Sequence, residues 1–248
     1  MHGGIMKRKC SKISLIAALT WLTVAFAFSP AVAADFGGKP MEQPAIAADP
    51  DWGPGWMVRL RGIGVLPDAD ADDVTANGAP LGANVDIDDS VVPELDLTYF
   101  FSPNFAAELI LAVTPHDIDG TGALAGSIGD AWLLPPILLA QYHFNPGGKF
   151  KPYLGAGVNY TVFFNEDAGG FLPNAGLTVS SLDLENSFGW ALQAGADIHL
   201  RDNMYLNIDV KKLWLETDAT VRTTAGVTVR ADVEINPWIV GIGLGWKL

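Results

Sequence analysis

Cysteine is almost absent from this sequence of 248 residues, with Cys10 as the single example. Basic residues are also few, 15 Lys and Arg against 28 Asp and Glu, and no basic cluster follows the first 12 residues. Proteins that bind nucleic acid neutralise phosphates with clustered Lys and Arg, so nucleic acid is excluded as a partner. After residue 33 the chain also lacks an apolar run of about 20 residues, which excludes a membrane-spanning helix there.

The first 33 residues have the three parts of a secretory signal peptide. A basic start precedes an apolar run from Ile13 to Phe28, and Ala31 and Ala33 provide the small residues of a cleavage site. The alternative, an anchoring transmembrane helix, needs a longer apolar run. Cleavage after Ala33 removes four of the 15 basic residues and no acidic ones, which leaves a net charge near −17. It also removes the cysteine, which suits export into an oxidising periplasm.

Beyond residue 55 the dominant pattern is an alternation of apolar and polar residues. Side chains on a β-strand change face at every residue, so this period predicts strands. The pattern occurs eight times, at 56–66, 91–101, 104–114, 134–144, 150–164, 187–200, 204–217 and 237–248. Residues 34–55 carry four prolines and no periodicity. We therefore predict a signal peptide at 1–33, a mostly unstructured periplasmic lead-in at 34–55 and one domain at 56–248.

One face of each predicted strand is apolar, and the other carries polar or charged residues. In the fourth strand Leu138, Tyr142 and Phe144 share a face, and Gln141 and His143 share the opposite one. An Arg or Lys that faces lipid near the midplane costs about 2–4 kcal/mol, so the charged rows must face inward. Without helices, only a closed barrel can span a membrane. We predict an all-β, eight-stranded antiparallel transmembrane barrel. The alternative, a soluble lipocalin-type barrel, would have to hold eight rows of large apolar side chains inside a narrow lumen.

The connections between the predicted strands alternate between long and short. The long ones are 67–90, 116–131, 165–186 and about 220–236, and the short ones lie at 102–103, 145–149 and 201–203. Long extracellular connections and short periplasmic turns are typical of barrels in the outer membrane of Gram-negative bacteria. The sequence thus predicts this localisation, with outer-membrane lipid and lipopolysaccharide as its surroundings.

Four segments, in order, resemble the OmpW family of small outer-membrane proteins. They are the strand from Leu134 to Phe144, the strand that begins Lys151-Pro152-Tyr153, the segment Asp209-Val210-Lys211-Lys212 and the ending from Pro237. The resemblance covers residues 56–248. It implies a narrow, largely hydrophobic extracellular channel that takes up small hydrophobic molecules and releases them sideways into the membrane. Members usually end in Phe, which assists recognition by the barrel assembly machinery, whereas this chain ends in Leu248.

Ionisable and polar residues on the inner faces predict a plug in the lumen. An eight-stranded barrel is just wide enough for its own side chains, so a continuous water-filled pore is not expected. Arg59 or Arg61 can pair with Glu94 or Asp96, because the first two strands are neighbours. The predicted plug residues are Arg59, Arg61, Glu94, Asp96, Glu108, Gln141, His143, Asn159, Asp197, Asp209 and Lys211. A proton or ion relay is the alternative role for this set.

Pro135 and Pro136 predict a lateral opening in the wall. Neither has an N–H to donate to a neighbouring strand. By strand order they lie in the extracellular half, where missing hydrogen bonds to the third strand could leave a gap. A hydrophobic solute would enter between the loops, meet the plug and leave through this gap. The alternative is that the prolines only end a strand at the rim.

The remaining candidates for chemistry are weak. The first long connection contains Asp68, Asp70, Asp72, Asp73, Asp86, Asp88 and Asp89. The first three have the spacing of a calcium loop, but the Gly and Glu that such a loop needs are missing. Asp197 and His199 share an inner face without a nearby Ser or Cys to activate. We therefore predict no cofactor, no dedicated metal site and no enzymatic activity. The alternative to a channel is a non-transporting surface receptor, an adhesin or a structural protein.

Overall fold

The structure is a computed structural model that describes residues 52–248. These residues form β-strands joined by turns, and none of their segments is a helix long and apolar enough to cross a membrane. The predicted signal peptide and residues 34–51 of the predicted lead-in lie outside the described residues.

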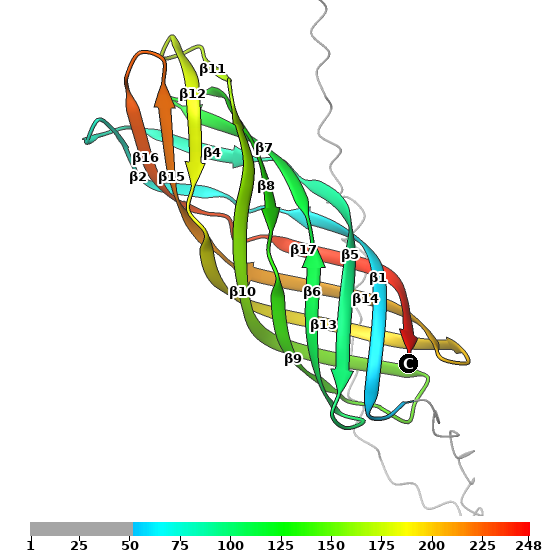
Figure 1. Cartoon of the computed structure of the whole chain (residues 1–248). Coiled ribbons are helices and arrows are strands. Elements are labelled where there is room, and N and C mark those ends of the chain that lie inside the picture. Colours follow the sequence, from blue (N-terminus) through cyan, green and yellow to red (C-terminus); the bar gives the residue numbers. More distant parts are fainter. Residues whose placement is uncertain (1–51) are drawn as a thin grey trace, which may run out of the picture. The chain divides into compact units, whose positions relative to one another are not determined.

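Eight strands form a closed antiparallel barrel, which confirms the predicted fold (Figure 1). Around the barrel the order is β13-β14-β17-β1-β5-β6-β9-β10, and the pairing of β10 with β13 closes the ring. The strands are β1 (Gly55–Leu66), β5 (Ser90–Phe100), β6 (Phe105–Ala112), β9 (Ile137–His143), β10 (Phe150–Ala168), β13 (Ser187–Arg201), β14 (Met204–Trp214) and β17 (Trp238–Lys247).

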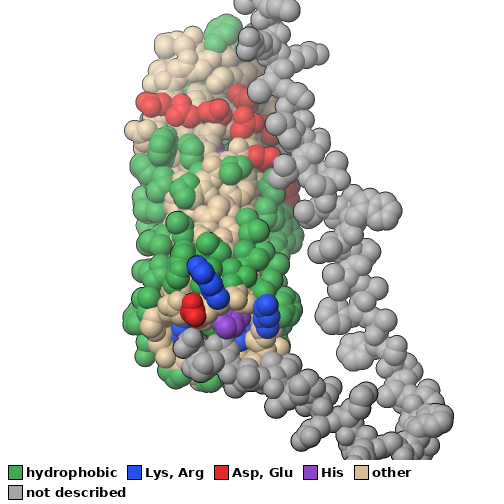
Figure 2. Space-filling model, turned by 90° about the vertical axis from the view of Figure 1, so that its right-hand side faces the viewer, with side chains coloured by type: hydrophobic (Ala, Val, Ile, Leu, Met, Phe, Trp, Pro, Cys, Tyr) green, Lys and Arg blue, Asp and Glu red, His purple; other side chains and the backbone are tan. Residues whose placement is uncertain are grey.

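The two faces of these strands have the predicted orientation. Arg59 and Asp96 are fully buried, whereas Leu95 is 40% exposed and Trp190 64% exposed on the outside. Since the lipid-facing side of an outer-membrane barrel is apolar, these exposed side chains belong in the hydrocarbon of the bilayer. Figure 2 shows the apolar surface below a band of acidic side chains.

The long connections are largely strands, which the sequence analysis did not predict. They continue the barrel wall beyond the membrane-spanning part as β2 (Asp70–Ala76), β3 (Ala79–Pro80), β4 (Ala83–Ile87), β7 (Thr114–Gly122), β8 (Gly126–Leu134), β11 (Phe171–Leu172), β12 (Leu177–Leu184), β15 (Glu216–Thr223) and β16 (Thr228–Glu234). We call this part the extension. One group pairs as β11-β12-β15-β16-β2-β3, and β4, β7 and β8 pair with one another and with β10. Within the extension an apolar core forms around Val74, Ile118, Leu172 and Val233.

Trp52 lies at the periplasmic end of the barrel, although it belongs to the predicted unstructured lead-in. Its side chain is 6% exposed and packs with Phe100 and Tyr205, at ring-centroid distances of 4.8 and 5.3 Å. Its indole N–H donates to the carbonyl oxygen of Pro103 at 2.9 Å. Trp52 therefore contributes its side chain to the interior of the barrel.

Candidate functional site: an apolar cavity above a charged floor

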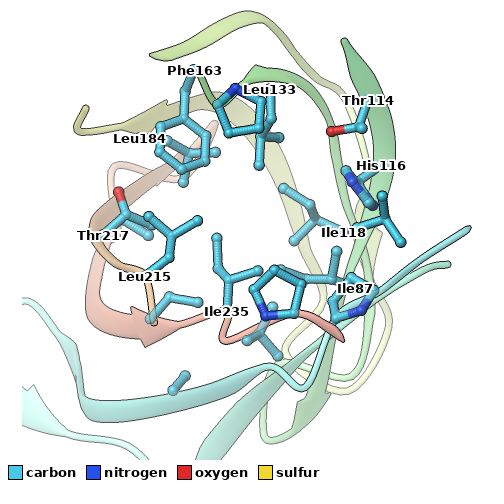
Figure 3. Close-up of a pocket in the computed structure, with 18 of the residues that line it drawn as sticks. Ile87, Thr114, His116, Ile118, Leu133, Phe163, Leu184, Leu215, Thr217 and Ile235 are labelled. Carbon is cyan, nitrogen blue, oxygen red and sulfur yellow. The ribbon is translucent and has the colours of Figure 1, made fainter. Parts of the chain in front are cut away.

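The extension and the upper part of the barrel enclose an apolar cavity. Its lining reaches from Glu94 and Ile110 in the barrel to Val74 and Val229 in the extension. In Figure 3, Ile118 and Ile87 line it on one side and Leu215 and Ile235 on the other. Aliphatic side chains predominate, and Phe163 carries the one phenyl ring among the lining residues. Such a surface offers dispersion contacts and little hydrogen bonding, which suits a hydrophobic ligand.

The sequence analysis missed most of this lining, because the residues lie in the extension. A signal was present: in 227–235 Val229, Val233 and Ile235 are buried, and Asp232 and Glu234, which alternate with them, are exposed. The same alternation that marks strands in the membrane therefore marks them here. The difference is that the apolar row faces inward.

Below the cavity, buried ionic side chains cross the lumen from wall to wall. Arg59 contacts Asp197 at 2.8 Å and Glu108 at 3.0 Å. Arg61 contacts Glu94 at 2.8 Å, Asp96 at 2.7 Å and Asp209 at 2.8 Å. Lys211 joins Glu94 at 3.0 Å to Asp209 at 2.9 Å. We call this network the charged floor. The predicted pairing with Glu94 and Asp96 is made by Arg61, whereas Arg59 pairs with acids of other strands.

Neutral polar groups complete the charged floor. The Gln141 side chain donates to Glu108 at 2.7 Å, and that of Gln193 donates to Asp209 at 2.9 Å. Gln193 was not among the predicted plug residues, and neither was Asn207, which accepts a hydrogen bond from Arg61 at 2.9 Å. Paired and hydrogen-bonded in this way, buried charges persist in a low-dielectric interior.

Two predicted plug residues lie at the margins of the charged floor. His143 is 3.3 Å from the side-chain oxygen of Gln141 and packs against Trp52 at the periplasmic end. Asn159 donates to Thr161 at 3.0 Å. Close packing leaves little free space in this part of the lumen. A Cβ atom added at Gly195 would lie 2.5 Å from the Tyr153 hydroxyl oxygen.

The strand pairing of the wall is interrupted at Pro135 and Pro136. Pairing between β6 and β9 ends at Ile110 with Ile137, and pairing between β7 and β8 begins at Thr114 with Leu133. Residues 111–113 are therefore not paired with residues 134–136, although Leu111 and Ala112 keep their partners on β5 and Leu134 keeps its partner on β10. On the other side, the Tyr160 N–H donates to the Pro136 oxygen at 3.1 Å, so the contact with β10 persists. Pro135 itself lines the apolar cavity.

Thr114 and His116 are adjacent on the cavity wall, directly above this interruption (Figure 3). The His116 Nδ1 lies 2.8 Å from the Asp88 carbonyl oxygen. Burial lowers the pKa of His116, although Asp88, Asp89 and Asp117 nearby oppose this effect. The imidazole is therefore neutral at pH 7, with Nδ1 as the donor to the carbonyl oxygen and Nε2 as a free acceptor.

Acidic side chains gather in a belt on the outside of the extension, which Figure 2 shows on one face. Cross-strand pairing places Asp117 beside Asp130, and Asp130 beside Asp167. It also places Asp232 between Asp72 and Asp218. We call this set, with the other exposed acids of the extension, the acidic belt. Asp68, Asp73, Asp86, Asp88 and Asp89 of the predicted acidic connection are also exposed. Among residues 52–248 no three His, Cys, Asp or Glu side chains are arranged to hold a metal ion.

Asp197 and His199, which the sequence analysis considered as a catalytic pair, lie apart from the cavity. Asp197 is held by Arg59 in the charged floor, and His199 contacts the Asp202 carbonyl oxygen in a periplasmic turn at 2.7 Å. The two side chains are therefore engaged in separate structural contacts.

Comparisons with known proteins agree with this architecture. Residues 55–248 match the model of the OmpW family. The chain is 42% identical to an uncharacterised outer-membrane protein, y4mB, of Sinorhizobium fredii, over 77% of this chain and 79% of that protein. It is 39% identical to outer membrane protein W of Vibrio cholerae, over 77% and 88%. The crystal structure of the outer membrane protein OprG from Pseudomonas aeruginosa superposes with a TM-score of 0.72 at 31% identity, covering 80% of this chain and 98% of that one.

Proposed function

Because this chain belongs to the OmpW family of Gram-negative outer-membrane barrels, we propose that it conducts small hydrophobic molecules across the outer membrane. The apolar cavity in the extension carries this proposal. Its lining gives a hydrophobic solute a water-poor path through the polar lipopolysaccharide layer, which otherwise opposes its passage. The receptor, adhesin or structural role remains the alternative.

The charged floor determines where the solute can go next. Transfer of an apolar molecule through a layer of buried ion pairs would break contacts that have no replacement partners, at a cost of several kcal/mol. A solute in the cavity therefore leaves sideways. The proposed exit is the interruption at Pro135 and Pro136 next to the cavity, because residues 111–113 and 134–136 do not pair with each other there.

Replacement of both prolines tests the lateral route. Pro135→Val with Pro136→Val supplies two backbone N–H groups and should extend the pairing of β6 with β9. We expect protein-dependent uptake of a fluorescent hydrophobic tracer by intact cells to fall severalfold. The matched control is Pro173→Val, because Pro173 is exposed between β11 and β12. Unchanged uptake in the double variant, with the two new backbone amides at positions 135 and 136 protected from hydrogen exchange, would refute the lateral route.

Uptake with and without the protein also separates the channel from its alternative. A surface receptor or adhesin can bind a tracer through the acidic belt, but it gives no flux. Two further partners belong to the proposal. Lipopolysaccharide would surround the acidic belt through bridging cations, and the barrel assembly machinery would insert the chain despite its terminal Leu248.

A further inference from the structure

We infer that the cavity selects neutral hydrophobic molecules that carry one hydroxyl group, such as alcohols and phenols, and that Thr114 and His116 bind this hydroxyl. The inference rests on the proposed channel function and deepens it, because it names the class of solute.

Elimination among the polar lining residues leads to this pair. Five polar side chains line the cavity: Asn84, Glu94, Thr114, His116 and Thr217. Asn84 bonds Asp70 at 2.5 Å, Glu94 bonds Lys211 at 3.0 Å, and the Thr217 hydroxyl donates to the Glu185 carbonyl oxygen at 2.6 Å. Within residues 52–248, the Thr114 hydroxyl and the His116 Nε2 have no hydrogen-bond partner, although both residues are buried.

The geometry of the two free groups fits one hydroxyl. Thr114 and His116 are two residues apart on β7 and face the same side, so their Cβ atoms are about 6–7 Å apart. A ligand oxygen between them can lie within hydrogen-bond distance of both. The Thr114 hydroxyl then donates to this oxygen, and the ligand O–H donates to Nε2, which is the acceptor because Nδ1 is bound to the Asp88 carbonyl oxygen.

Charge disfavours the other polar headgroups. A carboxylate at this position would lie among Asp88, Asp89 and Asp117, which already act on the His116 ring. An ammonium group would be attracted by the same three acids, but these do not line the cavity, and the one lining carboxylate, Glu94, is already paired with Arg61 and Lys211. An ammonium group would therefore lose its hydration without gaining a direct carboxylate partner. A plain hydrocarbon fits the apolar lining, but it gains nothing from Thr114 and His116.

The position of Thr114 and His116 on the proposed lateral route gives them a second role. Thr114 is the first residue of β7 after the pairing interruption. A hydroxyl held there would keep the solute at the opening of the lateral route, with its hydrocarbon part in the cavity.

Three naphthalene tracers test the inference in intact cells: 2-naphthol, its isostere 2-methylnaphthalene, and the anion 2-naphthoate. We expect protein-dependent uptake at low tracer concentration to favour naphthol over methylnaphthalene by about five- to tenfold, as one or two net hydrogen bonds allow. Naphthoate should be excluded. In Thr114→Val with His116→Phe the naphthol preference should fall to about one, while methylnaphthalene uptake persists.

Two single variants keep the result interpretable if the double variant fails to fold. Thr114→Ser retains the hydroxyl and should keep the preference, whereas Thr114→Val should lose part of it. Thr220→Val is the matched control, because Thr220 lies on β15 outside the lining. Equal wild-type uptake of naphthol and methylnaphthalene would overturn the inference and leave the channel intact. Absence of uptake for every tracer would instead refute the proposed function.

Discussion

Arg61 shows what a single buried charge does in this barrel. Its guanidinium lies within 2.8 Å of carboxylate oxygens of Glu94, Asp96 and Asp209, and its side chain is fully buried. Five acids of the charged floor share three basic side chains, Arg59, Arg61 and Lys211. Each base therefore offsets repulsion among several carboxylates.

Removal of Arg61 should accordingly destabilise the barrel. Arg61→Met keeps most of the side-chain volume but leaves buried carboxylates without their partner, at a cost of about 3–5 kcal/mol. Urea unfolding in detergent micelles measures this free energy. Arg222→Met, at an exposed position of β15, is the control and should change stability by less than about 0.5 kcal/mol. Equal effects of the two substitutions would show that the charged floor does not stabilise the fold.

At the residue scale, the sequence predicted which charges are inside and that an arginine of β1 pairs with Glu94 or Asp96, but not the pairs between distant strands. An Arg or Glu within a lipid-spanning strand has to face the lumen, so Arg59 and Glu108 could be assigned without a structure. Their partners depend on the stagger of strands around the ring, since Arg59 reaches Asp197 across 138 positions of sequence. Neutral side chains such as Gln193 and Asn207 carry a weaker signal, because either face near the rim tolerates them.

At the scale of the strand, polarity reverses along a continuous run of chain. In β14 Val210 and Trp214 face outward, whereas in β15, which begins two residues later, Glu216 and Asp218 face outward. The alternation continues in the same phase, and only the surroundings of the outward row change, from lipid to water. A search for apolar rows on the outside therefore stops at the membrane boundary, which is why the strands of the extension were expected as connections.

This reversal places acids opposite one another on neighbouring strands, with consequences for pH. A side-chain hydrogen bond with Asp218 raises the pKa of Asp232, and further carboxylates nearby raise it too. Because the pKa of Asp232 is higher in the folded state than in an unfolded chain, its stabilising contribution is complete below the ordinary pKa of Asp. That contribution is lost as the pH rises through the raised pKa.

Hydrogen exchange of the β15 and β16 amides should therefore slow as the pH falls from neutral toward that raised pKa, after correction for the intrinsic rate. In Asp232→Asn the hydrogen bond no longer needs a shared proton, so exchange should be slow at neutral pH and nearly independent of pH. Asp89→Asn, an exposed acid before β5, is the control. If the pH dependence of hydrogen exchange persists in Asp232→Asn, groups other than Asp232 cause it.

At the scale of the whole barrel, the lumen has three layers: the apolar cavity, the charged floor and an aromatic cluster at the periplasmic end. The cluster consists of Trp52, Met57, Phe100, Ala106 and Tyr205. Lys151 contacts its edge, with Nζ 4.9 Å from the Trp52 ring. The proline-rich composition of residues 34–55 gave no indication that Trp52 would be buried, because a single aromatic residue has no periodicity.

Trp52 is buried at the periplasmic end of the barrel, below the charged floor, and its effect on access from that end can be tested separately from the lateral route. Trp52→Ala removes a ring that packs on Phe100, His143 and Tyr205, which costs the cluster about 3 kcal/mol and should raise the population of open mouths about a hundredfold. A cysteine at Ala106, which is 4% exposed, reports the opening through its reaction with a membrane-impermeant maleimide from the periplasmic side. The one natural cysteine, Cys10, lies in the predicted signal peptide.

The control for this experiment is Trp56→Ala, four residues along the chain, because the Trp56 side chain is 52% exposed on the lipid-facing surface. We expect fast labelling in Trp52→Ala and slow labelling in both Trp56→Ala and the parent. Uptake of the hydrophobic tracer should be the same in all three, since a solute that leaves through the wall never reaches the mouth. If Trp52→Ala instead raised tracer uptake in step with labelling, the solute would be crossing the charged floor, and the lateral route would not be the exit.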